Sequence, residues 1–202
     1  QAAGGYTAVW ATENTRRAIF DAMVRKETYA TTGPRMTVRF FGGWEFAEED
    51  GRSRFPADVG YAKGVPMGGD LRHAPDGKSP SFLVAAMKDQ YSGNLDRIQI
   101  IKGYYKNGHP WEKIYDVVWS DEDKRRPGAD GKVPAVGNTV DINTATYSND
   151  RIGATQLRAV WSDPDFDPTQ HAVYYVRVRQ KYVVRDRPVY AWSTPIWVGT
   201  QP

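Results

Sequence analysis

Apolar residues recur at helical spacing in one long segment of this chain, residues 12–26. The apolar stripe consists of Ala18, Ile19, Ala22 and Met23, with charged residues on the other faces. Thr12 is a suitable N-cap because its hydroxyl can accept from the free N–H groups of the first turn. Gly33-Pro34 would prevent the helix from continuing. The pattern therefore predicts one long helix, preceded by a short strand at residues 5–10.

After that helix, the hydrophobic pattern is typical of short strands separated by polar loops. The clearest strand is residues 172–179, in which Ala172, Tyr174, Val176 and Val178 alternate with outward-facing residues. Asn107-Gly108 favours a tight turn, so the runs on either side of it predict a hairpin. Further strands are predicted at residues 36–41, 82–87, 96–105, 112–119 and 189–198, whereas residues 155–161 fit either a strand or a short helix.

This order of elements predicts a mainly β chain built around a β-sandwich-like domain. A single strand and helix ahead of an all-β body are what would remain at the end of a truncated α/β domain. The chain begins with Gln1 and has no signal-peptide pattern. We therefore expect either a processed form or a fragment, and the truncated pattern favours the fragment.

The composition excludes several classes of protein. An apolar share of 40% and an aromatic share of 13% can fill a substantial core, unlike those of a disordered chain. The net charge of +3 is too small for a nucleic-acid-binding surface, so no nucleic-acid partner is expected. Cysteine is absent, which excludes disulfides, thiolate metal sites and a cysteine nucleophile. No apolar run is long enough to predict a membrane span.

Residues 29–35, Tyr-Ala-Thr-Thr-Gly-Pro-Arg, are the best candidate for a substrate-binding site. Thr31 and Thr32 offer hydroxyl groups in an exposed turn, and Arg35 adds a cation suited to phosphate, sulfate or carboxylate. A rigid domain junction would explain the same residues, with Gly33 supplying an unusual φ and Pro34 stiffness. A binding role predicts that Arg35 is partly exposed, and a structural role predicts a buried salt bridge.

The other motifs do not indicate a catalytic centre. Residues 163–168 are rich in Asp, but a calcium loop of the EF-hand type needs Gly and Glu where this chain has Pro168 and Tyr174. Turn-forming Asp-Pro pairs account for that segment, although a non-standard cation site remains an alternative. His73, His109 and His171 lack any metal-ligand spacing, so no catalytic residue, metal ligand or cofactor site is predicted in this chain. Five aromatic residues either stack on sugars or fill the core: Tyr104, Tyr105, Trp111, Trp192 and Trp197.

Eight segments together resemble the C-terminal part of the domain-of-unknown-function family 3604. They include residues 5–16 (Gly-Tyr-Thr-Ala-Val-Trp-Ala-Thr-Glu-Asn-Thr-Arg) and the candidate site at residues 29–35. The others are residues 63–71, 94–103, 136–141, 161–168, 174–178 and 193–197. The resemblance covers nearly the whole chain. One departure lies at residues 179–184, where the family usually has a segment that contains Pro and Trp.

That family resembles the PHP-type (polymerase and histidinol phosphatase) metallohydrolases, which have a distorted β/α barrel with divalent metals. The resemblance implies that residues 1–35 hold the terminal strand and helix of an incomplete PHP-like barrel, and that residues 36–202 are a β-sandwich-like C-terminal domain. It implies an upstream barrel domain as partner, a divalent metal bound there by residues absent from this chain, and a periplasmic or secreted location.

Two hypotheses about function follow. In the first, the chain is the C-terminal portion of a PHP-like metal-dependent hydrolase acting on a phosphate, sulfate or related ester. Arg35, Thr31 and Thr32 would then bind the anionic substrate, while the chain alone would be inactive. In the second, it is a non-catalytic β module for stability, oligomerisation or carbohydrate binding.

Overall fold

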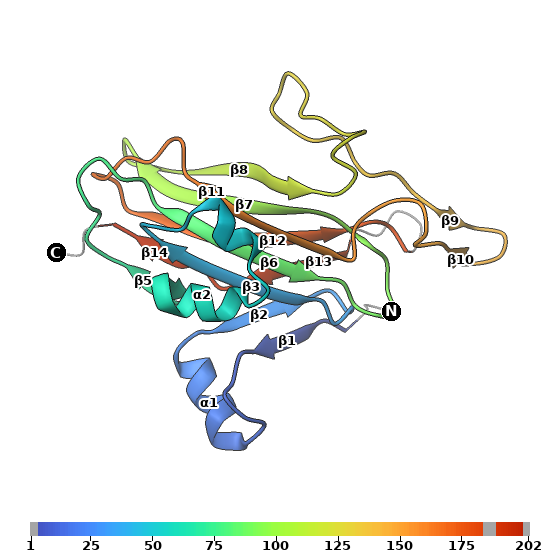
Figure 1. Cartoon of the computed structure of the whole chain (residues 1–202), viewed down its shortest axis with the longest axis horizontal. Coiled ribbons are helices and arrows are strands. Elements are labelled where there is room, and N and C mark those ends of the chain that lie inside the picture. Colours follow the sequence, from blue (N-terminus) through green and yellow to red (C-terminus); the bar gives the residue numbers. More distant parts are fainter. Residues whose placement is uncertain (1–3, 184–188, 200–202) are drawn as a thin grey trace.

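The computed structural model describes residues 4–183 and 189–199. The body of the molecule consists of two facing β-sheets (Figure 1). The large sheet has β1 (Tyr6–Val9), β2 (Thr28–Thr31), β13 (Val189–Ser193), β12 (Ala172–Gln180), β14 (Ile196–Val198) and β5 (Asp70–Leu71) in this order, with β7 (Leu95–Lys106) beside β12 and β8 (His109–Trp119) beside β7. The smaller sheet is β11 (Gln156–Ser162), β6 (Ser81–Met87), β3 (Thr37–Gly43) and β4 (Gly64–Pro66).

Helices and a small hairpin complete the described elements. They are α1 (Arg16–Val24), the short 3-10 helix η1 (Glu48–Arg52), α2 (Pro56–Lys63), and the pair β9 (Val140–Asp141) and β10 (Thr146–Tyr147). No described helix has both the length and the hydropathy to cross a membrane. The prediction of a mainly β fold is confirmed. The described residues form no closed barrel.

The main hydrophobic core lies between the two sheets. Alternate residues of β12 are buried, which confirms the inward face predicted from its period of two. Tyr174 on this face meets Phe82 of the smaller sheet, with ring centroids 4.6 Å apart, and Phe82 in turn stacks on Phe40 at 5.5 Å. The two sheets are therefore held together by the apolar faces that their alternating sequences create.

Most of the strands lie where the sequence predicted them. Residues 155–161, which fitted a strand or a short helix, lie almost wholly in strand β11. The turn between β7 and β8 confirms the predicted hairpin, because Asn107 and Gly108 both have positive φ, 53° and 80°. The short elements η1, α2, β4, β5, β9 and β10 were missed, and β2 was missed because most of its residues were assigned to the turn at residues 29–35.

Helix α1 is shorter than the predicted segment of residues 12–26, and its predicted N-cap was wrong. The N-cap is Thr15, whose hydroxyl accepts from the backbone N–H of Ala18 at 3.3 Å. The helix ends before Gly33-Pro34 because Lys26 adopts φ 60°. The N–H groups of Lys26 and Glu27 then bond the carbonyls of Met23 and Ala22, a Schellman motif with Lys in the left-handed position.

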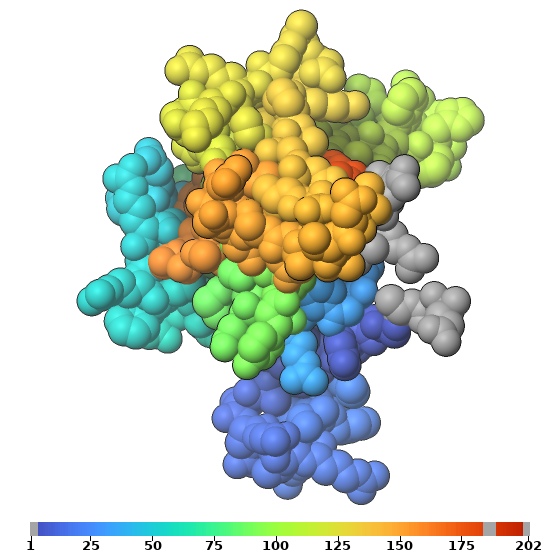
Figure 2. Space-filling view, turned by 90° about the vertical axis from the view of Figure 1, so that its right-hand side faces the viewer, coloured from blue at the N-terminus to red at the C-terminus, as the bar shows by residue number. Residues whose placement is uncertain are grey.

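Helix α1 protrudes from the β body (Figures 1 and 2). Ala18 and Ala22 are buried, as the predicted apolar stripe required, but Met23 is 50% exposed, so that part of the prediction was wrong. Phe20 and Val24, each 63% exposed, lie on the side of the helix opposite the two alanines. The helix thus has a second apolar face that the described residues do not cover.

Candidate functional site

The threonines of the predicted binding turn are engaged by the backbone. Thr31 is buried at the end of β2, and its hydroxyl accepts from the N–H of Gly33. The Thr32 hydroxyl accepts from the N–H of Tyr190 at 3.0 Å and donates to the carbonyl of the same residue at 3.4 Å. These bonds tie the turn to β13. The two hydroxyl groups therefore fix the position of the turn.

Arg35, in contrast, is exposed at the end of that turn. Its backbone N–H donates to the carboxylate of Asp89 at 2.6 Å, and its guanidinium lies over the ring of Tyr6, 5.4 Å from the centroid. No carboxylate within the described part of the chain forms an ion pair with it. The predicted exposure of Arg35 is confirmed, and the alternative of a buried salt bridge is not found among these residues.

A shallow pocket of about 550 Å³ lies beside Arg35. The neighbouring cation, Lys88, donates to the carbonyls of Asp89, Gln90 and Ser92 and is thereby held by the backbone. Backbone N–H groups of Tyr91 and Arg35, together with nearby cations, lower the pKa of Asp89 despite the opposing effect of partial burial. Asp89 is therefore a carboxylate that shapes this turn, and Arg35 is the cation here that remains available to an anion.

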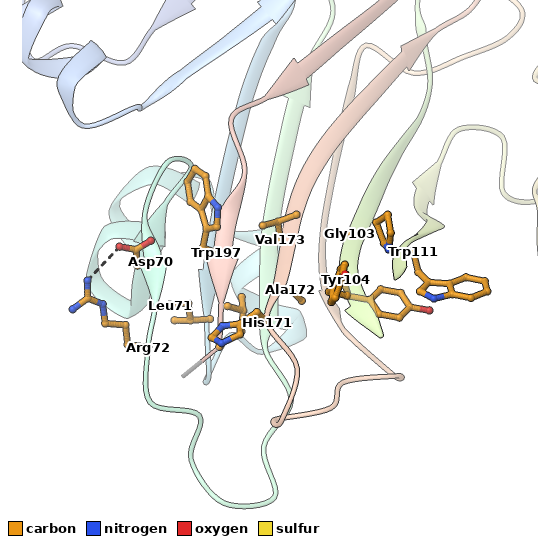
Figure 3. Close-up of a pocket in the computed structure, with 14 residues that line it drawn as sticks. Asp70, Leu71, Arg72, Gly103, Tyr104, Trp111, His171, Ala172, Val173 and Trp197 are labelled. Carbon is orange, nitrogen blue, oxygen red and sulfur yellow. Dashed lines mark hydrogen bonds and ion pairs between the residues drawn. The ribbon is translucent and has the colours of Figure 1, made fainter. Parts of the chain in front are cut away.

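A second pocket, of about 410 Å³, lies at one end of the large sheet on the face turned away from the core (Figure 3). Trp197 of β14, Val173 of β12 and Gly103 of β7 share this outer face, because they are directly opposite one another in register. Asp70 of β5 is opposite Trp197 on the side of β14 away from β12. The carboxylate of Asp70 forms an ion pair with Arg72 at 3.4 Å. We call this the outer-face pocket.

Aromatic residues surround the outer-face pocket. Tyr105, which is 60% exposed, and Trp197 line it from the outer face, whereas Tyr104 and Trp111 reach it from the opposite face of the sheet, which they share with the buried Ala172. Four of the five aromatics that the sequence suggested as stacking groups thus lie at one end of the sheet, two on each face. The fifth, Trp192, packs against Tyr190 on β13, with centroids 5.1 Å apart. The sequence indicated the residue types but missed the polar groups of this pocket, Asp70, Arg72 and His171, because nothing local marks them.

Two aspartates of the Asp-rich segment at residues 163–168 form ion pairs with lysines. Asp163 accepts from the buried ammonium of Lys102 at 2.6 Å and from the hydroxyl of Tyr174 at 2.6 Å. Asp165 accepts from Lys113 at 2.5 Å. Burial, and then the hydrogen bond to Asp163, raise the pKa of the Tyr174 phenol far above its usual range, so it stays protonated. These pairs favour a structural role over the alternative of a cation site.

Potential metal ligands do not cluster in the described residues. No group of three or more His, Cys, Asp or Glu side chains lies close enough to hold an ion within residues 4–183 and 189–199. The divalent metal that the resemblance implies does not fit any set of side chains found here. No step of a metal-dependent reaction can therefore be assigned to them.

Comparison with known proteins gives one match. A family model described as "Protein of unknown function (DUF3604)" matches residues 1–193. Neither the curated proteins nor the solved structures gave a match to this chain.

Proposed function

Because the chain belongs to the DUF3604 family, we propose that it is the C-terminal portion of a PHP-like metal-dependent hydrolase that cleaves a phosphate, sulfate or related ester. The hydrolase assignment rests on the resemblance of that family to the PHP-type enzymes. The metal ligands would lie upstream of this chain. Within the proposal, residues 1–35 complete the barrel, and residues 36–202 form the appended β domain.

The observation that carries this proposal is the second apolar face of α1. Phe20, Met23 and Val24 are spaced three and four residues apart and are all at least half exposed. Arg16 and Arg17 flank them. A short surface helix normally has one apolar stripe, whereas one that is apolar on two opposite sides is normally buried between two bodies. Ala18 and Ala22 are already buried within the chain, so an upstream barrel is the partner that would cover the other face.

Arg35 would be the contribution of this chain to substrate binding. Its guanidinium is stacked on Tyr6 of β1, the strand that would be the last of the barrel. An exposed guanidinium held by an aromatic ring can form two parallel hydrogen bonds to a phosphate or sulfate group. Thr31 and Thr32 would act indirectly, by fixing the turn that carries Arg35. The remaining residues of the chain take no part in the proposed chemistry.

The proposal is tested in the protein that contains this chain together with the upstream domain. Hydrolysis of p-nitrophenyl phosphate and p-nitrophenyl sulfate is measured with added manganese or zinc, for the parent and for Arg35→Ala. Loss of one preorganised charge donor should weaken transition-state stabilisation by roughly 2–4 kcal/mol. Arg151→Ala is the control because the Arg151 side chain is 81% exposed and pairs with its neighbour Asp150. Full activity of Arg35→Ala would reject its role, and no ester hydrolysis by the parent would reject the hydrolase.

The docking of α1 is tested separately. In the isolated chain, Phe20→Ser with Val24→Ser should change the free energy of unfolding by less than about 0.5 kcal/mol for each substitution, since both side chains are exposed. In the longer protein the same pair should expose the junction to limited proteolysis. Equal protease resistance of variant and parent would favour the alternative, a non-catalytic β module that folds and acts without a barrel.

A further inference from the structure

We propose that the outer-face pocket binds a saccharide. This inference does not rest on the hydrolase activity, because every residue that lines the pocket belongs to the large sheet or to the loops at its end. The pocket volume of about 410 Å³ is within the usual range of roughly 300–1,000 Å³ for small-molecule sites. It is open to solvent at one end of the sheet, so a longer ligand can extend beyond it (Figure 3).

The aromatic groups suit the apolar faces of sugar rings. Trp197 of β14 and Tyr105 of β7 both lie on this outer face, with β12 between their strands. Tyr104 and Trp111 reach the pocket from the opposite face of the sheet, because Tyr104 is directly opposite the buried Ala172, and Trp111 is opposite Tyr104. A pyranose ring presents C–H groups on its faces, and the electron-rich face of an indole or phenol attracts them. Trp197 and Tyr105 therefore offer two aromatic rings to a ligand on the outer face of the sheet.

The polar groups suit sugar hydroxyls. Asp70 can only accept hydrogen bonds, and Arg72 can only donate them. They lie side by side, 3.4 Å apart, and both remain partly exposed at 35% and 55% of their side-chain area. A pair of neighbouring sugar hydroxyls can donate a hydrogen bond to Asp70 and accept one from Arg72. His171, exposed at the base of the pocket, adds a third polar contact.

Two features show that the hollow is built by the sequence. Gly103 has no side chain to fill the floor, and a Cβ added there would approach Val173 to 3.0 Å. The ammonium of Lys26, which does not itself line the pocket, lies 4.5 Å from the centre of the Trp197 indole. Lys26 reaches that position from a left-handed backbone conformation that a lysine rarely adopts. The indole is thus held in place without a ligand.

The test is titration of the whole chain with cellohexaose, maltohexaose, mannohexaose and chitohexaose, followed by tryptophan fluorescence and calorimetry. At least one of the four should bind saturably. Trp197→Ala should then weaken binding at least about tenfold, which corresponds to the loss of one aromatic contact. Because Trp197 is half-buried, Tyr105→Ala serves as a second variant, since its exposed side chain can be removed without disturbing the core. Tyr91→Ala, at an aromatic residue 85% exposed and outside this pocket, should leave the affinity unchanged.

Each outcome bears on the proposal. Loss of binding in both pocket variants, with the Tyr91→Ala control unaffected, would support it. It would be overturned if none of the four oligosaccharides bound. It would also be overturned if binding survived both substitutions, or if indole or adenosine bound in the pocket while the sugars did not. None of these results depends on ester hydrolysis, so this inference and the proposed hydrolase fail independently.

Discussion

The carboxylate of Asp96 holds three arginines at the start of β7. It pairs with Arg97 at 3.3 Å, with Arg125 at hydrogen-bond distance and with Arg179 at 3.7 Å. The side chains of Asp96, Arg97 and Arg125 are all less than a tenth exposed. Arg97 and Arg125 also donate to the carbonyl of Pro134, at 2.7 and 2.6 Å. This cluster therefore fastens the long excursion after β8 to the large sheet.

Asp96→Asn should lower the free energy of unfolding by about 3–5 kcal/mol, the range for removing one partner of a buried ion pair. The substitution keeps the shape of the side chain and removes its charge. Arg97 would keep its second partner, Asp116, at 2.9 Å. Arg125 would retain only carbonyl and hydroxyl acceptors among the described residues. The cost is thus the cost of an uncompensated buried guanidinium, a large share of the roughly 5–15 kcal/mol typical of a domain.

Urea denaturation followed by tryptophan fluorescence measures this change, and Trp119 is a local reporter because its indole N–H donates to the carbonyl of Arg125 at 3.0 Å. The matched control is Glu48→Gln, which removes one carboxylate from an ion pair that is 77% and 78% exposed. The change that Glu48→Gln causes in the free energy of unfolding should be close to the error of the measurement. The reasoning is refuted if Asp96→Asn shifts the denaturation midpoint no more than Glu48→Gln does.

Three further outcomes are expected. Phe82→Ala should destabilise the chain by about 3–5 kcal/mol in the same assay, because the ring is fully buried between the sheets; a loss below about 1 kcal/mol would contradict the assignment of the core. The pKa of Asp89 is lowered in the folded chain, so its carboxylate adds stability above pH 3.8, the ordinary pKa of Asp. This stability is lost as the pH falls through the lower pKa of the folded state. In Asp89→Asn the urea midpoint should therefore fall less on acidification than in the parent. The same fall in both proteins would contradict this prediction. After incubation with manganese or zinc and then dialysis into metal-free buffer, metal analysis should find no stoichiometric ion bound to the chain. An ion held by His73, His109 or His171 would disprove this.

Local signals were sufficient for most strands. The alternation in β12 and the positive φ of Asn107 and Gly108 depend on residues within a few positions of each other, so the sequence predicts them directly. Strand β2 was missed because its pairing is distant: Thr31 is opposite Tyr6 on one side and Ala191 on the other. A segment of Thr, Tyr and Ala beside Gly-Pro looks like a turn until those partners are known.

Helix α2 shows the same limit in another form. Pro56 at its first turn is a start signal that was present in the sequence. Gly60 in its middle argued against a helix, since glycine costs about 1 kcal/mol there. The glycine is explained only by packing, because a Cβ at this position would lie 2.4 Å from the ring of Phe41. Tertiary contact, rather than propensity, decided this residue.

The sequence by itself determined that the chain is mainly β, that one helix precedes the β body, and that Arg35 follows a glycine turn. Only the tertiary structure decided which charges are free: Arg35 is exposed, whereas Arg97 and Arg125 are buried around Asp96. It also decided that Trp197, Gly103 and Asp70 meet in one pocket. The physical reason is range. Periodicity and turn geometry act over a few residues, while burial, ion pairing and pocket shape depend on strands that are far apart in the chain.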